Sequence, residues 1–373
     1  MTAAAAPPSS VPRPPSSRLD AIDWLRGLAV VLMIQTHLYD SWVAPAARTS
    51  EAFWWTRFLG GIPARLFLLL VGVSMAIRFE SQLGKSVDRA TMCRGMAKRG
   101  LEIVGLAYLF RLQEFTLGGF GAPVSDLFRI DILNCIGACM IVVPFLAAPR
   151  NGRPQYAASL AFAVVFVALG PIIGPAHFPD WLPRPLTSYL GGERPMAWFP
   201  IFPWAAWPLV GVAVGHWWVR QNRDPRRQAL AFLLTGLGGA ALTLAVIIVR
   251  RINPYIIRYP SELVQQMGPG SFFYRLGLLG PLALLAYGVT RALGPRFSVM
   301  RQFGRTSLLV YWIHVDLCYG SVSKPLHHRL GMVWATVGFV GMVALMLAIS
   351  VLKTKYWKGW RRHERSRHPA IAG

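Results

Sequence analysis

Long apolar segments alternate along this chain with short polar connections. Ten apolar stretches have the length of a helix, and each is near the roughly 20 residues that an α-helix needs to cross a bilayer. Several contain Gly or Pro, which membrane helices tolerate. The pattern predicts an all-α, polytopic membrane protein of about ten transmembrane helices, near residues 21–43, 60–79, 98–115, 129–147, 156–174, 199–219, 228–249, 272–291, 303–321 and 331–352.

The composition agrees with lipid as the solvent. Hydrophobic residues make up 54% of the chain and charged residues only 15%, whereas soluble domains carry roughly 25% charged residues. The formal net charge of +23 could indicate a nucleic-acid-binding protein. The basic residues, however, stand in short runs between apolar stretches, which is typical of topology signals. We therefore predict no nucleic-acid partner.

The placement of Lys and Arg predicts the orientation. They concentrate in the even-numbered connections, at 78–99, 150–153, 220–227 and 291–305, and in the two tails. Since cytoplasmic loops of membrane proteins are enriched in Lys and Arg, both termini are predicted to be cytoplasmic. The segments 44–59, 175–198 and 250–271 would then lie outside, and their Trp, Tyr and Pro residues are typical of interfacial or substrate-facing loops.

Three regions follow from these patterns. Residues 1–17 are rich in Pro, Ala and Ser and lack the apolar core of a signal peptide, which predicts a disordered cytoplasmic tail. Residues 18–353 form one transmembrane domain. Residues 354–373 form a basic, aromatic cytoplasmic tail that we expect to lie on anionic lipid headgroups.

The cysteines give no sign of a disulfide or a metal site. Cys135 and Cys139 share a helix face four residues apart, a spacing at which small residues usually serve helix packing. Cys93 and Cys318 stand apart from them, and no pair has the arrangement of a zinc site. We expect neither disulfides nor a bound metal.

The first predicted helix contains two ionisable residues that are costly in lipid and are therefore functional candidates. His37 follows Arg26 by eleven residues, which is about 16 Å along a helix and close to three turns, so both lie on nearly the same face. Arg26 would stand at the cytoplasmic mouth and could bind the phosphates or pantetheine of coenzyme A, with His37 as base in the outer half of the membrane. The structural alternative is an Arg that extends to the interface and a His bonded to a neighbouring helix.

The ninth predicted helix contains a second pair of candidates. Arg305 begins this helix at the cytoplasmic side, where it could also bind the donor, and His314 follows nine residues later, at mid-membrane depth. His314 could belong to the catalytic site, or it could bond to a backbone carbonyl or hydroxyl in a structural role.

The fourth predicted helix begins with Asp131, which could orient a histidine and raise its basicity. Asp131 could equally pair with Arg129, Arg65 or Arg111. At the sixth helix, the aromatic and proline residues of 198–207 are typical of an interfacial belt, and they could also line a sugar-binding pocket.

Five segments together resemble the membrane acyltransferase superfamily, and within it the bacterial branch similar to the heparan-alpha-glucosaminide N-acetyltransferase catalytic domain. They are RLDAIDWLRGLAVVLMIQTHLYD, LFLLLVGVSMAIRF, RIDILNCIG, FPIFPWAAWPLVGVAVG and FGRTSLLVYWIHV, in the order expected for that branch. The resemblance implies a multipass acetyltransferase of the bacterial inner membrane. Such an enzyme takes an acyl group from cytoplasmic acyl-CoA, with acetyl-CoA as co-substrate, and delivers it to a sugar across the membrane.

The resemblance also implies roles for single residues. Arg26 and His37 match the Arg and His that the bacterial enzymes need, and His314 matches a histidine that recurs in the last block. The lysosomal relatives place their proposed catalytic His slightly later, in the lumenal loop, and loop 41–57 has no His here. The departure leaves His37 as the candidate and favours another cell-envelope glycan or amino sugar over heparan as acceptor.

Two other classes of protein remain open at this stage. A transporter or flippase of an envelope lipid or glycan would share the buried polar residues, although no ATP-binding loop is present. A membrane scaffold would tolerate apolar replacement of its buried His and Arg. The sequence leaves open the acceptor, N- or O-acylation, the acyl length, direct transfer or an acyl-histidine, and whether the chain forms a homo-oligomer.

Overall fold

The chain folds into helices. The computed structural model describes residues 20–117, 123–179, 181–191, 197–222, 224–253 and 268–367, so the predicted tail at 1–17 lies outside the described residues. Within those ranges the only regular elements are α-helices and short 3₁₀ turns. The all-α prediction is confirmed.

Each predicted segment overlaps a helix of the structure. At most of the helix ends, the observed bound lies within a few residues of the predicted one. The long helices are α1 (Asp20–Trp42), α3 (Pro63–Leu83), α4 (Arg89–Leu117), α5 (Ile132–Ala147), α6 (Tyr156–Ile173), α9 (Ala206–Gln221), α10 (Pro225–Ile252), α12 (Pro269–Leu293), α14 (Ser307–Tyr319) and α15 (Met332–Arg367). The shorter ones are α2 (Glu51–Gly60), α7 (Arg184–Leu190), α8 (Ile201–Trp204) and α13 (Val299–Arg305). Thus α2 and α7 lie in connections that the sequence predicts to be exterior.

Two predicted helices are broken in the structure. In the sixth, Phe202 has non-helical dihedrals inside the short α8, and α9 begins only at Ala206. The prolines at 203 and 208 in this region each remove a backbone donor. In the ninth, Thr306 (φ −121°, ψ 17°) separates α13 from α14, and its hydroxyl bonds to Ser350 Oγ of α15 at 2.5 Å. The apolar pattern runs through both breaks, so it could not reveal them.

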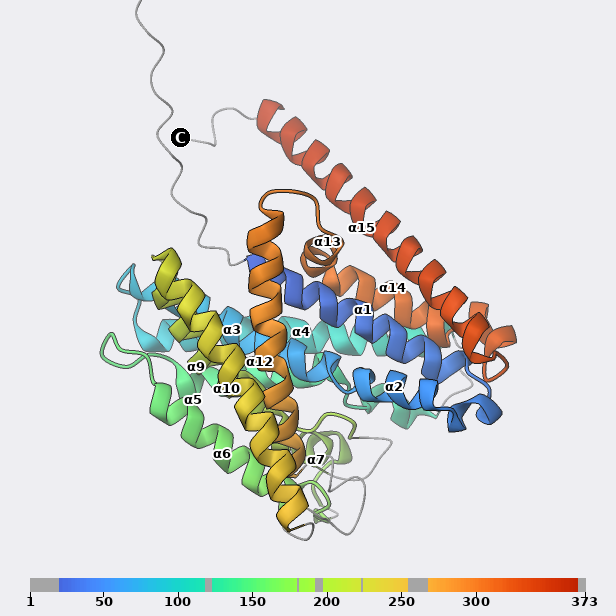
Figure 1. Ribbon diagram of the computed structural model, residues 1–373, viewed down its shortest axis with the longest axis horizontal. Helices are drawn as coiled ribbons and strands as arrows, with labels where there is room; N and C mark the ends of the chain where they lie inside the picture. The colour runs from blue at the N-terminus through green and yellow to red at the C-terminus, as the bar shows by residue number, and fades with distance from the viewer. Residues whose placement is uncertain are drawn as a thin grey trace, which may run out of the picture.

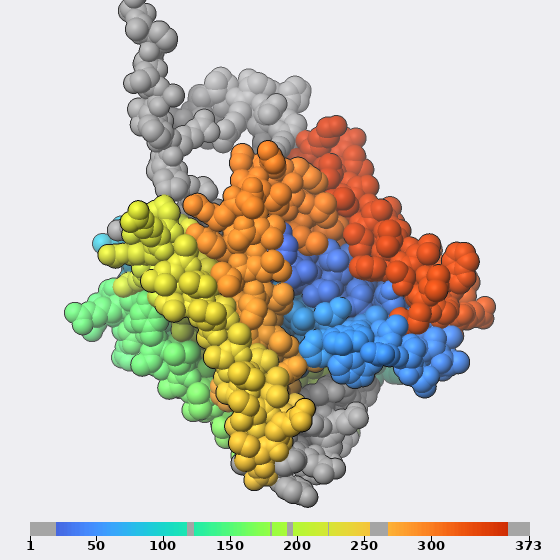
Figure 2. Space-filling model, in the orientation of Figure 1, coloured from blue at the N-terminus to red at the C-terminus, as the bar shows by residue number. Residues whose placement is uncertain are grey.

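Five helical segments are long and apolar enough to cross a membrane. They are Glu51–Leu83, Tyr156–Ile173, Pro225–Ile252, Pro269–Leu293 and Met332–Tyr356. α10 and α15 expose rows of Leu and Val on the surface that Figure 2 shows in yellow and red, and lipid tolerates such apolar surfaces. The protein is therefore a multi-pass membrane protein. α1 is long enough but is not among the five, because polar residues such as Arg26, Gln35 and His37 interrupt its apolar sequence.

The helices pack as neighbouring pairs around α1. α3 packs along α9, α4 along α5 and α10 along α12, while α1 contacts α3, α12, α13, α14 and α15 (Figure 1). α15 runs along one edge of the molecule, and α1 and α14 lie side by side beneath it. This central position lets residues of α1 meet residues from both ends of the sequence.

A close crossing of α1 and α13 sets this arrangement. A Cβ atom added to Gly27 would lie 1.8 Å from the carbonyl oxygen of Met300, and one added to Gly304 would lie 1.9 Å from that of Asp23. Only glycine permits the two backbones to approach so closely, as is common where membrane helices pack. The crossing fixes the position of α13, and hence of α14, along the axis of α1.

We expect Gly304→Ala to lower the stability of the protein by about 1–3 kcal/mol, because the added methyl group forces the two backbones apart. Gly288→Ala is the matched control, since a Cβ at Gly288 of α12 meets nothing within 4 Å. Thermal unfolding of the purified variants in detergent measures the effect. Equal melting temperatures for both variants would contradict the close crossing.

Candidate functional site

Two arginines meet at the N-terminal end of α1. Asp23 is buried, with 2% of its surface exposed. Its Oδ1 accepts from Arg26 Nη1 at 3.3 Å, and its Oδ2 lies 3.7 Å from Arg305 Nε. Arg26 Nη2 also donates to Ser74 Oγ of α3 at 3.3 Å. Asp23 thus holds Arg26 and Arg305, which the sequence proposes as donor-binding residues, on either side of one carboxylate.

Beside these arginines lies a cavity of about 770 Å³, a volume typical of small-molecule sites. Five helices each contribute one cation to its lining: Arg26 of α1, Arg78 of α3, Arg99 of α4, Arg305 of α13 and Lys353 of α15. Among the described residues that line it there is no Asp or Glu. The cavity is therefore suited to an anionic ligand.

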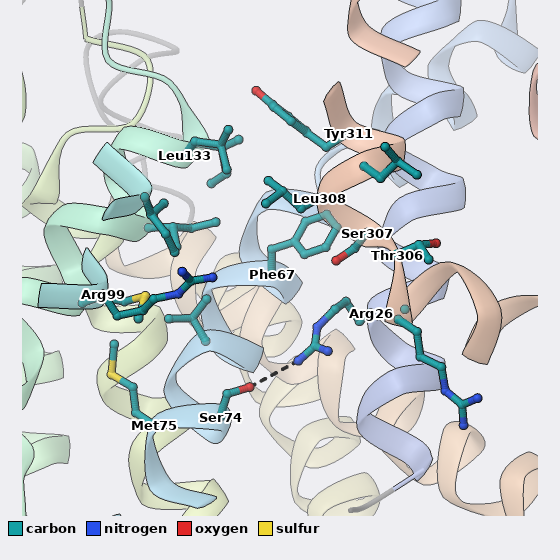
Figure 3. A pocket seen from close by; sticks show the side chains of 18 of the residues that line it. Arg26, Phe67, Ser74, Met75, Arg99, Leu133, Thr306, Ser307, Leu308 and Tyr311 are labelled. Carbon is teal, nitrogen blue, oxygen red and sulfur yellow. Dashed lines mark hydrogen bonds between the residues drawn. The ribbon is translucent and has the colours of Figure 1, made fainter. Parts of the chain in front are cut away.

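The cavity changes character along its length. Figure 3 shows Arg26, Arg99 and Ser74 in one part and Leu133 and Tyr311 in another, with Phe67 and Leu308 between them. Ile103, Ile132, Ile136 and Met140 extend the apolar lining on the side of α4 and α5. A ligand with a charged end and an apolar or weakly polar arm would match this gradient.

The two histidines meet near the apolar part. His37 Nδ1 lies 2.9 Å from His314 Nε2, with the rings nearly coplanar at 2°. His314 is fully buried, whereas His37 is partly exposed. His314 also makes the backbone contact that the sequence left open as its structural alternative. Its Nδ1 lies 2.7 Å from the carbonyl oxygen of Val310.

These contacts assign the protons of the neutral histidine pair. The carbonyl of Val310 can only accept, so Nδ1 of His314 carries a proton and its Nε2 is a bare acceptor. Nδ1 of His37 must then donate to that Nε2. Nε2 of His37 is left with an unshared electron pair, which is what a general base requires.

The lining of the cavity ends next to the histidine pair, and neither histidine is part of that lining. Met33 of α1 and Tyr311 of α14 line the cavity, each about one helical turn before a histidine, and the Tyr311 ring meets the His314 ring edge-on with centroids 6.0 Å apart. Beyond His37, the Tyr319 ring packs edge-on at 5.6 Å and its hydroxyl donates to Asp40 Oδ2 at 3.1 Å. The pair thus lies between the cavity and the C-terminal end of α1.

Asp131 is placed differently from its predicted role. Its carboxylate pairs with Arg111 of α4 and lies 3.7 Å from Arg129 Nε, and its backbone N–H donates to Asn134 Oδ1 at 3.3 Å. In the described part of the chain its partners are these residues rather than either histidine. The structure therefore favours the ion pair with Arg111, which is one of the alternatives that the sequence left open. Asp131 stands at the N-terminal end of α5.

Some residues around the cavity are ones that sequence reasoning did not single out. Asp23 stands three residues before Arg26, a spacing that places both on one helix face, so its pairing could have been foreseen. Arg78, Arg99 and Lys353 stand in or beside basic runs that the sequence predicts to be topology signals. Tyr311 lies within an apolar stretch, and no spacing distinguishes it from core aromatics.

Comparison with known proteins identifies a family that covers more than half of the chain. The model of one protein family, described as heparan-alpha-glucosaminide N-acetyltransferase, catalytic, matches residues 18–247. The match includes Arg26, His37 and Asp131, and it ends before α12, so Arg305 and His314 lie beyond it. A comparison with curated protein sequences gives no match.

We expect nitrogen NMR of histidine-labelled protein at alkaline pH, where imidazoles are neutral, to show His37 and His314 each protonated at Nδ1. His314→Ala removes the acceptor for His37 and should convert His37 to a mixture of tautomers. A dominant Nε2–H form of His37 in the wild-type protein would contradict the assigned proton positions. His216→Ala, which removes a buried histidine of α9 paired with Glu80, should leave the His37 signal unchanged.

Proposed function

Because this chain belongs to the heparan-alpha-glucosaminide N-acetyltransferase catalytic family, we propose that it is a membrane acetyltransferase with acetyl-CoA as donor. The acceptor is a sugar or amino sugar of a cell-envelope glycan on the outer side of the membrane. The observation that carries this proposal is the contact between His37 and His314, about one helical turn beyond Met33 and Tyr311, which line a cavity together with five cations.

The donor enters the cavity from the cytoplasm. The five cations of the lining bind the phosphates of coenzyme A, because guanidinium groups form charge-assisted hydrogen bonds with phosphate oxygens. The pantetheine arm then extends past Phe67 and Met33 and brings the thioester toward the histidines. The absence of carboxylates among the described lining residues favours this anionic ligand over a cationic one.

His37 acts as the general base. Its Nε2 takes the proton of the acceptor hydroxyl or amine as the acceptor attacks the thioester carbonyl. The positive charge that His37 gains is shared through the hydrogen bond to His314 and on to the carbonyl of Val310. His314 thus orients His37 and fixes the tautomer that leaves the base free.

The acceptor approaches from the other side of His37. Asp40 and Tyr319 lie there, together with the aromatic residues of α2, of which Trp54 and Trp55 are about half exposed. Sugars stack on such rings, while hydroxyl and carboxyl groups bind their polar edges. In this arrangement Asp131 stabilises the contact between α4 and α5 through its ion pair with Arg111. Its effect on the site is indirect, because residues of these two helices line the cavity.

The topology follows from the same assignment. All ten predicted helices cross the inner membrane of a bacterium, with the cationic ends of α1, α13 and α15 on the cytoplasmic side. Both termini are cytoplasmic. An acetyl group then passes from a cytoplasmic donor to an outer acceptor without movement of the whole donor across the bilayer.

We expect the purified wild-type protein in nanodiscs to release free CoA from acetyl-CoA in the presence of an amino-sugar or glycan acceptor. His37→Ala should lower the turnover by about 10²–10⁴-fold, since it removes the base. His314→Ala should lower it by roughly 10–100-fold, since His37 is kept but no longer oriented. Release of CoA is followed with a thiol reagent across a panel of acceptors.

An active His37→Ala protein would rule out His37 as the base. If the wild-type protein neither binds nor turns over any acyl-CoA, the acetyltransferase proposal fails, and a transporter of an envelope lipid or glycan takes its place.

We expect Arg305→Gln to raise the KM for acetyl-CoA roughly tenfold with little change in kcat, because the lost cation contacts the phosphates and not the reacting atoms. Arg227→Gln is the matched control. This arginine of α10 is 75% exposed and pairs with Asp224 at 3.6 Å, away from the cavity lining. Equal KM values for the two variants would exclude Arg305 from the donor site.

A further inference from the structure

We propose that the hydroxyl of Tyr311 binds the carbonyl oxygen of the acyl thioester and stabilises the oxyanion that forms during transfer. The inference rests on the proposed acetyltransferase function and assigns a further catalytic residue to it. It is carried by the position of Tyr311 in the cavity and by the hydrogen bonds of the groups around it.

Tyr311 is held at the histidine end of the cavity. The side chain is 8% exposed and lines the cavity, and Figure 3 shows it projecting from α14 with its hydroxyl on the side of Leu133. Its ring packs against Phe110 of α4, with centroids 5.6 Å apart, and against His314 at 6.0 Å. These contacts hold the ring in one place beside His314 and so give the hydroxyl a defined position in the cavity.

The hydroxyl of Tyr311 has no hydrogen-bond partner among the described residues, whereas the hydroxyls of other tyrosines in the protein do. The hydroxyl of Tyr39 bonds to Thr336 Oγ1 at 2.6 Å, Tyr319 to Asp40 Oδ2 at 3.1 Å, and Tyr108 to the hydroxyl of Tyr189 at 3.1 Å. A buried tyrosine hydroxyl normally finds a partner. The free hydroxyl of Tyr311 is therefore available to a ligand in the cavity.

The histidine pair cannot supply this donor. In the neutral pair, the N–H of His314 is used by the carbonyl of Val310 and the N–H of His37 by His314. The remaining nitrogen, Nε2 of His37, accepts a proton and donates none at the moment of attack. Four lining residues other than Tyr311 carry hydroxyls: Ser74, Ser81, Thr306 and Ser307. Those of Ser74 and Thr306 bond to backbone carbonyls, and Ser307 stands one helical turn before Tyr311, next to Thr306 (Figure 3). Ser81 lies farther along α3, seven residues after Ser74.

The reaction then balances as follows. The acceptor's lone pair forms a bond to the thioester carbonyl carbon, the C=O electron pair moves to the oxygen, and His37 Nε2 takes the acceptor's proton. The oxyanion accepts a hydrogen bond from Tyr311, which is stronger than the bond to the neutral carbonyl and so favours the transition state. The carbonyl then re-forms, the C–S bond breaks, and the sulfur leaves with the electron pair and receives the proton from His37.

The test is Tyr311→Phe, which removes the hydroxyl and keeps the ring contacts with Phe110 and His314. We expect kcat to fall on the order of 100-fold, while the dissociation constant of a thioether analogue of acetyl-CoA changes by less than about fivefold. Tyr39→Phe is the matched control, because it removes a buried hydroxyl that faces α15. It should keep the wild-type kcat.

A spectroscopic readout separates catalysis from packing. With carbonyl-labelled acetyl-CoA bound in the absence of acceptor, the infrared carbonyl band should lie at lower frequency in the wild-type protein and in Tyr39→Phe than in Tyr311→Phe. A normal kcat or an unshifted band for Tyr311→Phe beside an active wild-type protein would overturn this inference and leave the acetyltransferase proposal standing. Failure of the wild-type protein to turn over acetyl-CoA would overturn both.

Discussion

The close crossing of α1 and α13 is the constraint on which the site depends. Gly27 and Gly304 let the two backbones approach, and this fixes the position of α13, and of α14 after it, along α1. Arg26 and Arg305 then meet at Asp23, and His37, farther along α1, meets His314 of α14. A shift of one helical turn, about 5.4 Å, would separate both pairs at once.

The second constraint is that polar groups in lipid must find partners within the protein. In α1 and α14 this requirement produces a chain of hydrogen bonds from His37 through His314 to the carbonyl of Val310. These hydrogen bonds give both ring nitrogens of the buried His314 a partner. Because each donor points away from His37, Nε2 of His37 is left without a proton. The hydrogen bonds that satisfy the buried His314 therefore also determine which nitrogen of His37 can take a proton.

The groups of the site are divided along α1, as the proposed two-sided reaction requires. Five helices contribute cations to the lining of the cavity, and Tyr319 and Asp40 lie beyond the histidines, toward the C-terminal end of α1. In the proposed function, an anionic donor and a sugar acceptor approach His37 from opposite directions. Each helix contributes only one or two groups, and the packing of the bundle assembles them.

The sequence by itself determined the helices, since an apolar stretch of about 20 residues can satisfy its backbone in lipid only as a helix. It also put Arg26 and His37 on one face, because that follows from helical geometry alone. The meeting of His37 with His314, the pairing of Asp131 with Arg111, the breaks at Phe202 and Thr306 and the cationic cavity were decided by the tertiary structure. These features join residues that are far apart in the sequence, such as His37 and His314 at 277 positions, or depend on how neighbouring helices cross. The pattern along one helix carries no information about which other helix lies against it.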